Sequence, residues 1–224
     1  MHTNTLPFLL LRCALPLVAA LPCSAVLAQM SQMAEPVNTV KLGVIDYQTH
    51  ARTTGITGLG VPAGADASIG SATTLLFTYE RSVSPHLGVE FVLGVPPKIT
   101  ARGAGTVPFL GEVLSARNVA PTVLLNYHFG EPGDGLRPYV GAGINYTRFT
   151  DTKTPYGWKV DLSDSWGLVL QAGVDYALGA QWGLFASVGA VQVKSDLVAV
   201  GAAVLRTTID FRPVTFSAGV SYRF

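Results

Sequence analysis

The fold is decided by the stretch Phe216-Ser217-Ala218-Gly219-Val220-Ser221-Tyr222-Arg223-Phe224. Read with a period of two residues, it has one apolar face, and the alternate positions carry serine, glycine and Arg223. This alternation predicts a β-strand with one apolar face. A soluble sheet buries such a face in a core. Tyr222 and Phe224 are instead typical of a strand whose outward face meets the aromatic girdle of a membrane barrel.

The first 28 residues have the pattern of a secretory signal peptide. Arg12 is the only one of them charged at pH 7 with histidine neutral, their apolar run is broken by Pro16, and small residues precede the predicted cleavage site. A retained membrane helix would need a longer uninterrupted apolar run. A lipoprotein signal at Cys23 is disfavoured because the residue before that cysteine is a proline. We predict that residues 1–28 are removed and that residues 29–224 form one barrel domain.

Composition excludes several functional classes. Both cysteines lie in the predicted leader, so the barrel domain has no disulfide and no thiolate ligand or nucleophile. The chain has 15 Lys and Arg against 14 Asp and Glu, and loss of Arg12 with the leader leaves no formal net charge. No basic stripe indicates a nucleic-acid partner. The histidines His50, His86 and His128 lack a metal-ligand spacing, so we predict no metal and no cofactor.

Alternating segments account for the rest of the chain. No run of about 18 apolar residues follows the leader, and without spanning helices only a closed barrel can cross lipid. Strands are predicted near 39–48, 72–82, 86–95, 119–129, 137–147, 165–178, 181–194 and at a last segment ending at 224. The short connections 83–85, 130–136 and 179–180 are predicted periplasmic turns, and the long ones, 50–71, 96–118, 149–164 and 195–210, external loops. We expect an all-β, eight-stranded antiparallel up-and-down barrel in the outer membrane; a soluble lipocalin-like barrel would need an apolar interior.

Four blocks of the chain resemble the OmpW family of small outer-membrane proteins. They are Arg137-Pro138-Tyr139-Val140-Gly141-Ala142-Gly143-Ile144-Asn145-Tyr146-Thr147, residues 121–130, residues 163–167 with 173–176, and the tail 216–224. The resemblance implies an eight-stranded barrel without enzymatic activity that helps small, mainly hydrophobic molecules across the outer membrane; a relative assists alkane uptake. The external loops depart from the family in their glycine, alanine and proline content, and Gly189 and Val191 stand where bulky aromatics are expected.

The inward-facing positions predict two zones in the lumen. Near the periplasmic turns we expect a charged plug of Lys41, Glu80, Glu90, His128, Asp175 and Arg223, because opposite charges in a narrow barrel would pair. Above it we expect a hydrophobic path of Leu76, Val92, Leu124, Val169, Phe185 and Val191, joined by loop residues Ile56, Leu59, Val61, Val107, Phe109 and Leu110. We expect Tyr222 and Phe224 to form the C-terminal signal for the barrel-assembly machinery.

This arrangement suggests a hydrophobic funnel above a closed floor, with sideways exit through the wall into lipid. Pro96, Pro97, Pro121 and Pro213 remove ladder donors. They either weaken the wall at such an exit or simply end strands. The alternative function is a non-conducting structural barrel whose loops are bound by phage, bacteriocins or host proteins.

Other residues carry weaker signals. An enzymatic site would need His128, Glu90 and a strand serine within hydrogen-bond reach, and no Ser-His spacing supports it. The tryptophans 158, 166 and 182 are predicted interface anchors. Arg148, Lys153 and Lys159 either contact lipopolysaccharide phosphates or form a solvated loop face. The expected partners are therefore membrane lipid, lipopolysaccharide, small hydrophobic solutes and the assembly machinery, and a monomer is expected because a closed barrel has no free edge.

Overall fold

A computed structural model describes residues 38–224 of the chain except residues 50, 54, 202 and 203. The predicted signal peptide lies outside these described residues. No helix in the described part is long and apolar enough to cross a membrane. The helical segment recorded there is the 3-10 turn η1 (Pro108–Leu110).

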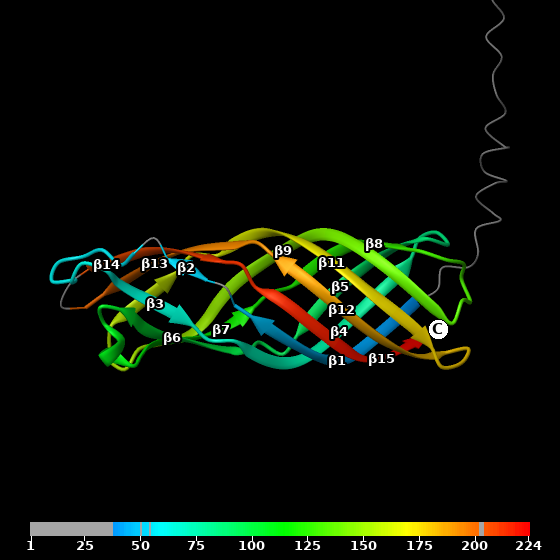
Figure 1. The fold of residues 1–224 in the computed structure, drawn as a ribbon, viewed down its shortest axis with the longest axis horizontal. Coiled ribbons are helices and arrows are strands. Elements are labelled where there is room, and N and C mark those ends of the chain that lie inside the picture. Colours follow the sequence, from blue (N-terminus) through cyan, green and yellow to red (C-terminus); the bar gives the residue numbers. More distant parts are fainter. Residues whose placement is uncertain (1–37, 50, 54, 202–203) are drawn as a thin grey trace, which may run out of the picture. The chain divides into compact units, whose positions relative to one another are not determined.

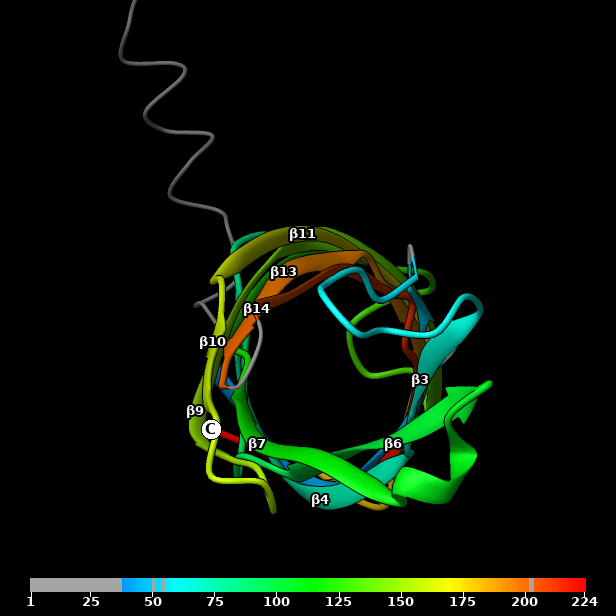
Figure 2. The ribbon, with the colours of Figure 1, turned by 90° about the vertical axis from the view of Figure 1, so that its left-hand side faces the viewer.

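Eight antiparallel strands close into a barrel (Figure 1). They are β1 (Asn38–Gln48), β4 (Ala72–Ser82), β5 (Leu87–Gly94), β8 (Thr122–His128), β9 (Leu136–Lys153), β11 (Ser165–Ala177), β12 (Trp182–Val191) and β15 (Val214–Arg223). Each strand pairs with the next in this order, and β1 pairs with β15 from Thr39↔Arg223 to Gln48↔Val214. Viewed end-on, the strands form a ring (Figure 2). The predicted fold class is confirmed.

The long connections are mostly strands rather than loops. They contain β2 (Arg52–Thr53), β3 (Ala65–Ile69), β6 (Lys98–Gly105), β7 (Glu112–Val119), β10 (Lys159–Leu162), β13 (Val193–Val200) and β14 (Val204–Phe211). β7, β6 and β3 continue the barrel sheet alongside the upper part of β9, and β10, β13, β14 and β2 form a separate four-stranded sheet. We call these seven strands, the segments 55–64, 106–111 and 154–158 between them, and residues 148–153 of β9 the extension. The connections predicted as external loops thus contain strands of their own, because cross-strand pairing orders segments whose own alternation is weak.

The barrel is apolar outside and charged inside. The side chains of Leu168 and Leu170 are 65% and 64% exposed, whereas Lys41 is 1% exposed. A soluble lipocalin-like barrel has the opposite distribution, with apolar side chains inside and polar side chains outside. The outward apolar faces are therefore suited to contact lipid.

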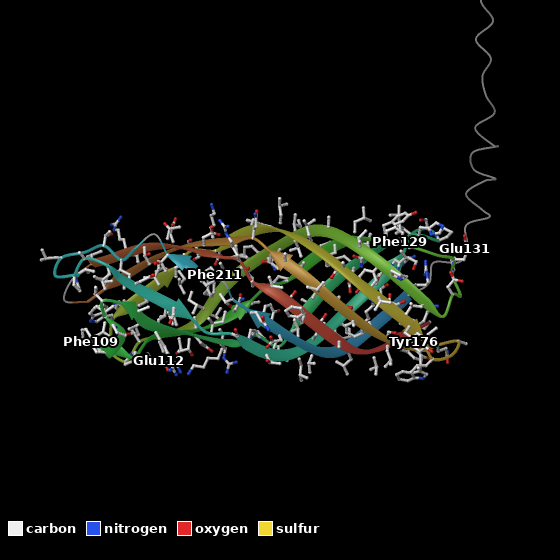
Figure 3. The ribbon with its side chains drawn as sticks, in the orientation of Figure 1. Phe109, Glu112, Phe129, Glu131, Tyr176 and Phe211 are labelled. Atoms are coloured by element: carbon white, nitrogen blue, oxygen red, sulfur yellow. The ribbon has the colours of Figure 1, made fainter. Side chains whose placement is uncertain are left out.

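Aromatic side chains mark both edges of the apolar band. Trp182 packs on Tyr222 near the short turns, and Tyr146 packs on Trp166 at the opposite edge. Figure 3 shows Tyr176 and Phe129 at the end with the short turns, far from Phe109 in the extension. Along β11, Trp166 and Tyr176 are about 25 Å apart in the direction of the barrel axis, at a rise of about 3.3 Å per residue and a tilt of about 40°. That spacing matches the lipid-facing band of outer-membrane barrels.

Candidate functional site: an ionic floor beneath two cavities

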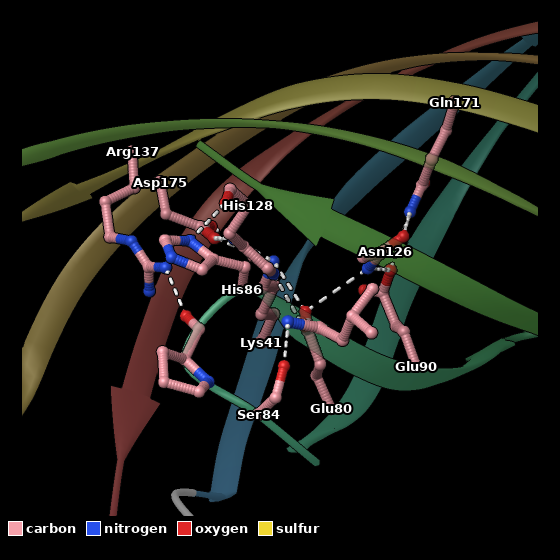
Figure 4. A network of polar contacts seen from close by, with 12 residues as sticks. Lys41, Glu80, Ser84, His86, Glu90, Asn126, His128, Arg137, Gln171 and Asp175 are labelled. Atoms are coloured by element: carbon pink, nitrogen blue, oxygen red, sulfur yellow. Dashed lines mark hydrogen bonds and ion pairs between the residues drawn. The ribbon is translucent and has the colours of Figure 1, made fainter. Parts of the chain in front are cut away.

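An ionic cluster lies in the barrel interior near the short turns (Figure 4). Lys41 Nζ lies 3.0 Å from Asp175 Oδ1 and 3.5 Å from Glu80 Oε2. His128 Nε2 lies 2.6 Å from Glu80 Oε1, and its Nδ1 is 3.8 Å from Asp175 Oδ2. The lysine and the histidine thus each approach both carboxylates. We call these four residues the floor cluster.

A layer of amides lies next to the floor cluster. Asn126 Nδ2 donates to Glu90 Oε2 at 2.9 Å and to Glu80 Oε2 at 3.3 Å. Gln171 Nε2 donates to the same Glu90 oxygen at 2.7 Å and to Asn126 Oδ1 at 2.8 Å. Glu90 is 3% exposed, and within the described residues it has no cation within 4.0 Å. Neutral amides therefore satisfy this buried carboxylate, which fits the rule that buried charges need hydrogen-bond partners.

Two glycines make room for this packing. A Cβ at Gly88 would overlap Glu80 Oε1, and a Cβ at Gly141 would overlap Asn126 Oδ1. Both glycines lie on strands next to the residue that they accommodate. Any larger residue at either position would displace a member of the network.

Five of the six predicted plug residues come together, and Arg223 does not join them. It lines a small pocket with Asp134, Arg137 and Asp175, and among the described residues it makes no ion pair within 4.0 Å. Along β15, Arg223 is the next inward-facing residue after Ser221, and Ser221 is the register partner of Lys41. Arg223 was predicted to belong to the ionic cluster; it lies beside Asp175 of that cluster without an ion pair to it within 4.0 Å.

Sequence reasoning missed Asn126, Gln171 and Arg137 as members of the site. Arg137 Nη2 donates to the carbonyl of Pro85 at 2.9 Å and so ties β9 to the turn before β5. The period-two pattern placed both amides inward, but only their hydrogen bonds to Glu90 assign them to the floor. Their inward position next to charged residues was the available signal.

An inner cavity of about 100 Å³ lies above the floor. All six residues predicted for the hydrophobic path line it, and Leu76, Leu124 and Phe185 are almost fully buried. The cavity is more polar than the prediction, since its wall also contains Thr78, Asn145, Thr147, Gln171, Ser187 and Ser217. The inner cavity is therefore amphipathic rather than uniformly apolar.

An outer cavity of about 220 Å³ lies within the extension. Its wall is mainly apolar and includes Ile56, Val107, Leu110, Val113, Trp158 and Leu205. Three predicted loop residues thus line it, whereas Leu59 and Phe109 are 88% and 79% exposed. Trp158 was predicted to be an interface anchor, but it lines this cavity beside Tyr156; Trp166 and Trp182 are exposed on the barrel exterior.

A hydrophobic cluster separates the two cavities. It consists of Ala101, Leu114, Ala116, Leu162, Val193, Ile209 and Phe211, with Phe149, Val160 and Val191 packed against it. Phe149 and Phe211, which line the inner cavity, have ring centroids 5.6 Å apart. Ile209 and Leu114 line the outer cavity. We call this cluster the partition.

The prolines predicted to weaken the wall lie at strand junctions. The carbonyl oxygens of Pro97, Pro121 and Pro213 accept hydrogen bonds of 3.0–3.1 Å from neighbouring backbone amides. Proline has no N–H with which to return a ladder bond. Each junction is therefore paired but lacks one possible donor. Pro97 and Pro213 also line the inner cavity.

The geometry does not assemble the enzymatic group considered from the sequence. His128 contacts Glu80 rather than Glu90, and Glu90 is bonded by amides. Within the part of the chain that the structure describes, there is no group of three or more His, Cys, Asp or Glu side chains that could hold a metal ion.

A closed barrel with an apolar exterior and a charged interior is a transmembrane protein of the outer membrane. The chain belongs to the OmpW family, whose model matches residues 38–224. It is 34% identical over 169 residues to outer membrane protein AlkL of Ectopseudomonas oleovorans, covering 75% of this chain and 73% of that one. It is 32% identical to outer membrane protein W of Vibrio cholerae over 71% of this chain and 77% of the relative. A third relative, the dibenzothiophene metabolism operon protein PahQ of Pseudomonas aeruginosa, is 34% identical over 63% of this chain and 65% of its own length.

Solved structures share the fold. The crystal structure of OprG from Pseudomonas aeruginosa superposes with a TM-score of 0.79 at 24% identity, covering 84% of this chain and 96% of OprG. The solid-state NMR structure of AlkL in lipid bilayers gives a TM-score of 0.65 at 29% identity, over 86% of this chain and 92% of AlkL. The family and the outer-membrane location expected from the sequence are thereby confirmed.

Proposed function

We propose that this protein conducts small, mainly apolar molecules across the outer membrane. The observation that carries the proposal is the stack of two cavities above a floor of paired charges. The outer cavity is mainly apolar and exceeds the volume of about 150 Å³ that accommodates benzene in a protein interior. A small aromatic or aliphatic molecule fits it in both size and chemistry.

One relative supports an apolar aromatic cargo. The name of PahQ assigns it to a dibenzothiophene metabolism operon. Trp158 and Tyr156 line the outer cavity, and aromatic side chains pack favourably on planar apolar rings. An aromatic hydrocarbon is therefore the solute with which we would first test this chain.

We propose that the solute leaves sideways through the barrel wall. We expect the floor cluster to block the axial route, because opening it would separate buried charges at a cost of several kcal/mol. The wall offers an alternative where Pro97 and Pro213 border the inner cavity and Pro121 lies at the junction of β7 and β8. Each of these positions lacks a ladder donor. We assign no catalytic step to the protein.

Uptake into proteoliposomes tests the proposal. The solutes are toluene and benzoate, which have similar size but differ in charge. We expect the protein to accelerate uptake of toluene and to leave benzoate uptake unchanged. Acceleration of both would indicate a water-filled pore and contradict the closed floor. Acceleration of neither would reject the conduit.

A surface-receptor function is the second candidate. The observation in its favour is the exposure of Leu59 and Phe109 in the extension, because large exposed apolar side chains are common at protein interaction sites. This function predicts that Leu59→Ser with Phe109→Ser abolishes recognition of the cell by a phage or bacteriocin while solute uptake is unchanged.

A further inference from the structure

Three cations lie side by side on the outward face of the wall: Lys98 on β6, Arg117 on β7 and Arg148 on β9. The strand register places Lys98 directly opposite Arg117 and Arg148 opposite Val119, so that Arg148 is a diagonal neighbour of Arg117. Their chain neighbours Ile99, Asn118 and Phe149 line the inner cavity, so the three cations point away from it. All three side chains are exposed.

Acidic groups only partly compensate this charge. Arg117 Nε lies 3.2 Å from Asp151 Oδ2. Within the described residues, Lys98 and Arg148 form no ion pair within 4.0 Å, and the nearby Asp164 accepts a hydrogen bond from Tyr146. Like charges directly opposite each other on neighbouring strands repel. An anion bound between them from outside the protein would remove this repulsion.

The cations lie just beyond the external edge of the apolar band. On β9, Arg148 is the next outward-facing residue after Tyr146. Tyr146 packs on Trp166 with ring centroids 4.9 Å apart. On the membrane side, the same outward face exposes Val119 and Ile144. Lipid headgroups lie at the level of such aromatic girdles. An anion at this position would therefore be joined to acyl chains.

We propose that Lys98, Arg117 and Arg148 bind the phosphate groups of a phosphorylated glycolipid of the outer leaflet, with its acyl chains along Val119 and Ile144. Arginine and lysine bind phosphate through charge-assisted hydrogen bonds. A free phosphate ion would gain only the polar half of this site, whereas a phosphorylated lipid gains the apolar half as well. Lys153 and Lys159, which the sequence made equal candidates, lie farther along the extension: Lys153 pairs with Ser115 and Lys159 with Val200.

Titration of the full-length mature protein with bis-phosphorylated lipid A tests the site. The protein is held in phosphatidylcholine nanodiscs with a chelator present to exclude metal bridging, and bound lipid is counted by native mass spectrometry. Lys98→Gln with Arg148→Gln should weaken binding roughly 30-fold, at about 1 kcal/mol for each basic side chain near a membrane surface. The matched variant Lys153→Gln with Lys159→Gln removes the same charge and should bind like the unmodified protein.

Two further titrations separate the lipid from its headgroup. Dephosphorylated lipid A should bind roughly 30-fold more weakly than the phosphorylated form, and inorganic pyrophosphate at the same concentration should not displace the lipid. The proposal is overturned if dephosphorylated lipid A binds as tightly, if pyrophosphate competes equally, or if both double variants behave alike. Because no solute uptake is measured, the result is independent of the proposed conduit function.

Discussion

The ion pair between Lys41 and Asp175 crosses the lumen of the barrel. Lys41 lies on β1 and Asp175 on β11, and these strands are separated in the sheet by β12 and β15. The 3.0 Å contact therefore joins opposite parts of the wall. It fixes the floor through a connection that strand pairing does not supply.

Replacing Lys41 with methionine should destabilise the barrel by about 3–5 kcal/mol, because the carboxylates of Glu80 and Asp175 would stay buried without their lysine. Urea unfolding in lipid vesicles measures the change. The exposed substitution Lys159→Met is the control and should change stability by less than about 0.5 kcal/mol. Equal stability of the two variants would show that the floor cluster does not depend on the lysine.

Removing the whole ion pair should open the floor to ions. Lys41→Ala with Asp175→Ala deletes both sides of the contact, and we expect ion conductance in planar bilayers above that of the unmodified protein. Arg117→Ala with Asp151→Ala removes an exposed ion pair outside the lumen and should leave conductance unchanged. A floor variant with unaltered conductance would place the barrier at the partition instead.

Thr78 and Thr122 should respond in opposite ways to replacement by valine. Among the residues that the structure describes, the buried Thr78 Oγ1 has no hydrogen-bond partner, so Thr78→Val should be neutral or stabilising. Thr122 Oγ1 accepts a 2.7 Å hydrogen bond from Asn145, the shortest of the three that this amide donates, so Thr122→Val should cost about 1 kcal/mol by removing it. Thermal unfolding of both variants checks this contrast, which a uniform loss of stability would refute.

The partition should limit how fast bulky solutes pass between the cavities. Phe211→Ala removes one of the two rings at this level, and we expect faster uptake of an apolar solute larger than toluene. Phe109→Ala removes an exposed ring of equal size and should leave uptake unchanged. Slower or unchanged uptake through a Phe211→Ala barrel that is still folded would show that the partition is not a barrier.

Pro121→Val tests the sideways exit. Valine supplies the backbone N–H that proline lacks. The N–H of Tyr146 already donates to the carbonyl of Pro121, so the strand register would direct the new N–H to the carbonyl of Tyr146. A stronger ladder at this junction should slow toluene uptake and raise thermal stability. Uptake at the original rate in a more stable barrel would mean that the solute leaves elsewhere.

The barrel strands were predictable because lipid imposes a strict alternation on them. The extension was not predictable, because its segments lie outside lipid, so that no strict alternation is imposed on them, and they are ordered by pairing with one another. Residues 98–105, Lys-Ile-Thr-Ala-Arg-Gly-Ala-Gly, alternate only weakly because two glycines follow Ile99 and Ala101 on the same face, yet they pair with β7 and β3.

The floor was predictable in composition but not in connectivity. Alternation indicates which side chains point inward, whereas the stagger between strands decides which of them lie at one height. Arg223 faces the lumen, but along β15 it is the next inward-facing residue after Ser221, the register partner of Lys41. Asn126 and Gln171 escaped notice because neutral amides give no charge signal, and only their bonds to Glu90 reveal them.

The pairing of β1 with β15 has a consequence for how the barrel forms. Thr39 and Arg223 are register partners at nearly opposite ends of the described chain, so the closing seam joins the strands that are most distant in sequence. Closing so long a loop carries the largest entropic cost of any strand pair in the barrel. Until β15 is in place, β1 and β12 each present an unpaired edge, and lipid offers no hydrogen-bond partners for the backbone N–H and C=O groups of such an edge. Insertion and closure must therefore be coupled, and a chain interrupted before β15 would have no stable place in the membrane.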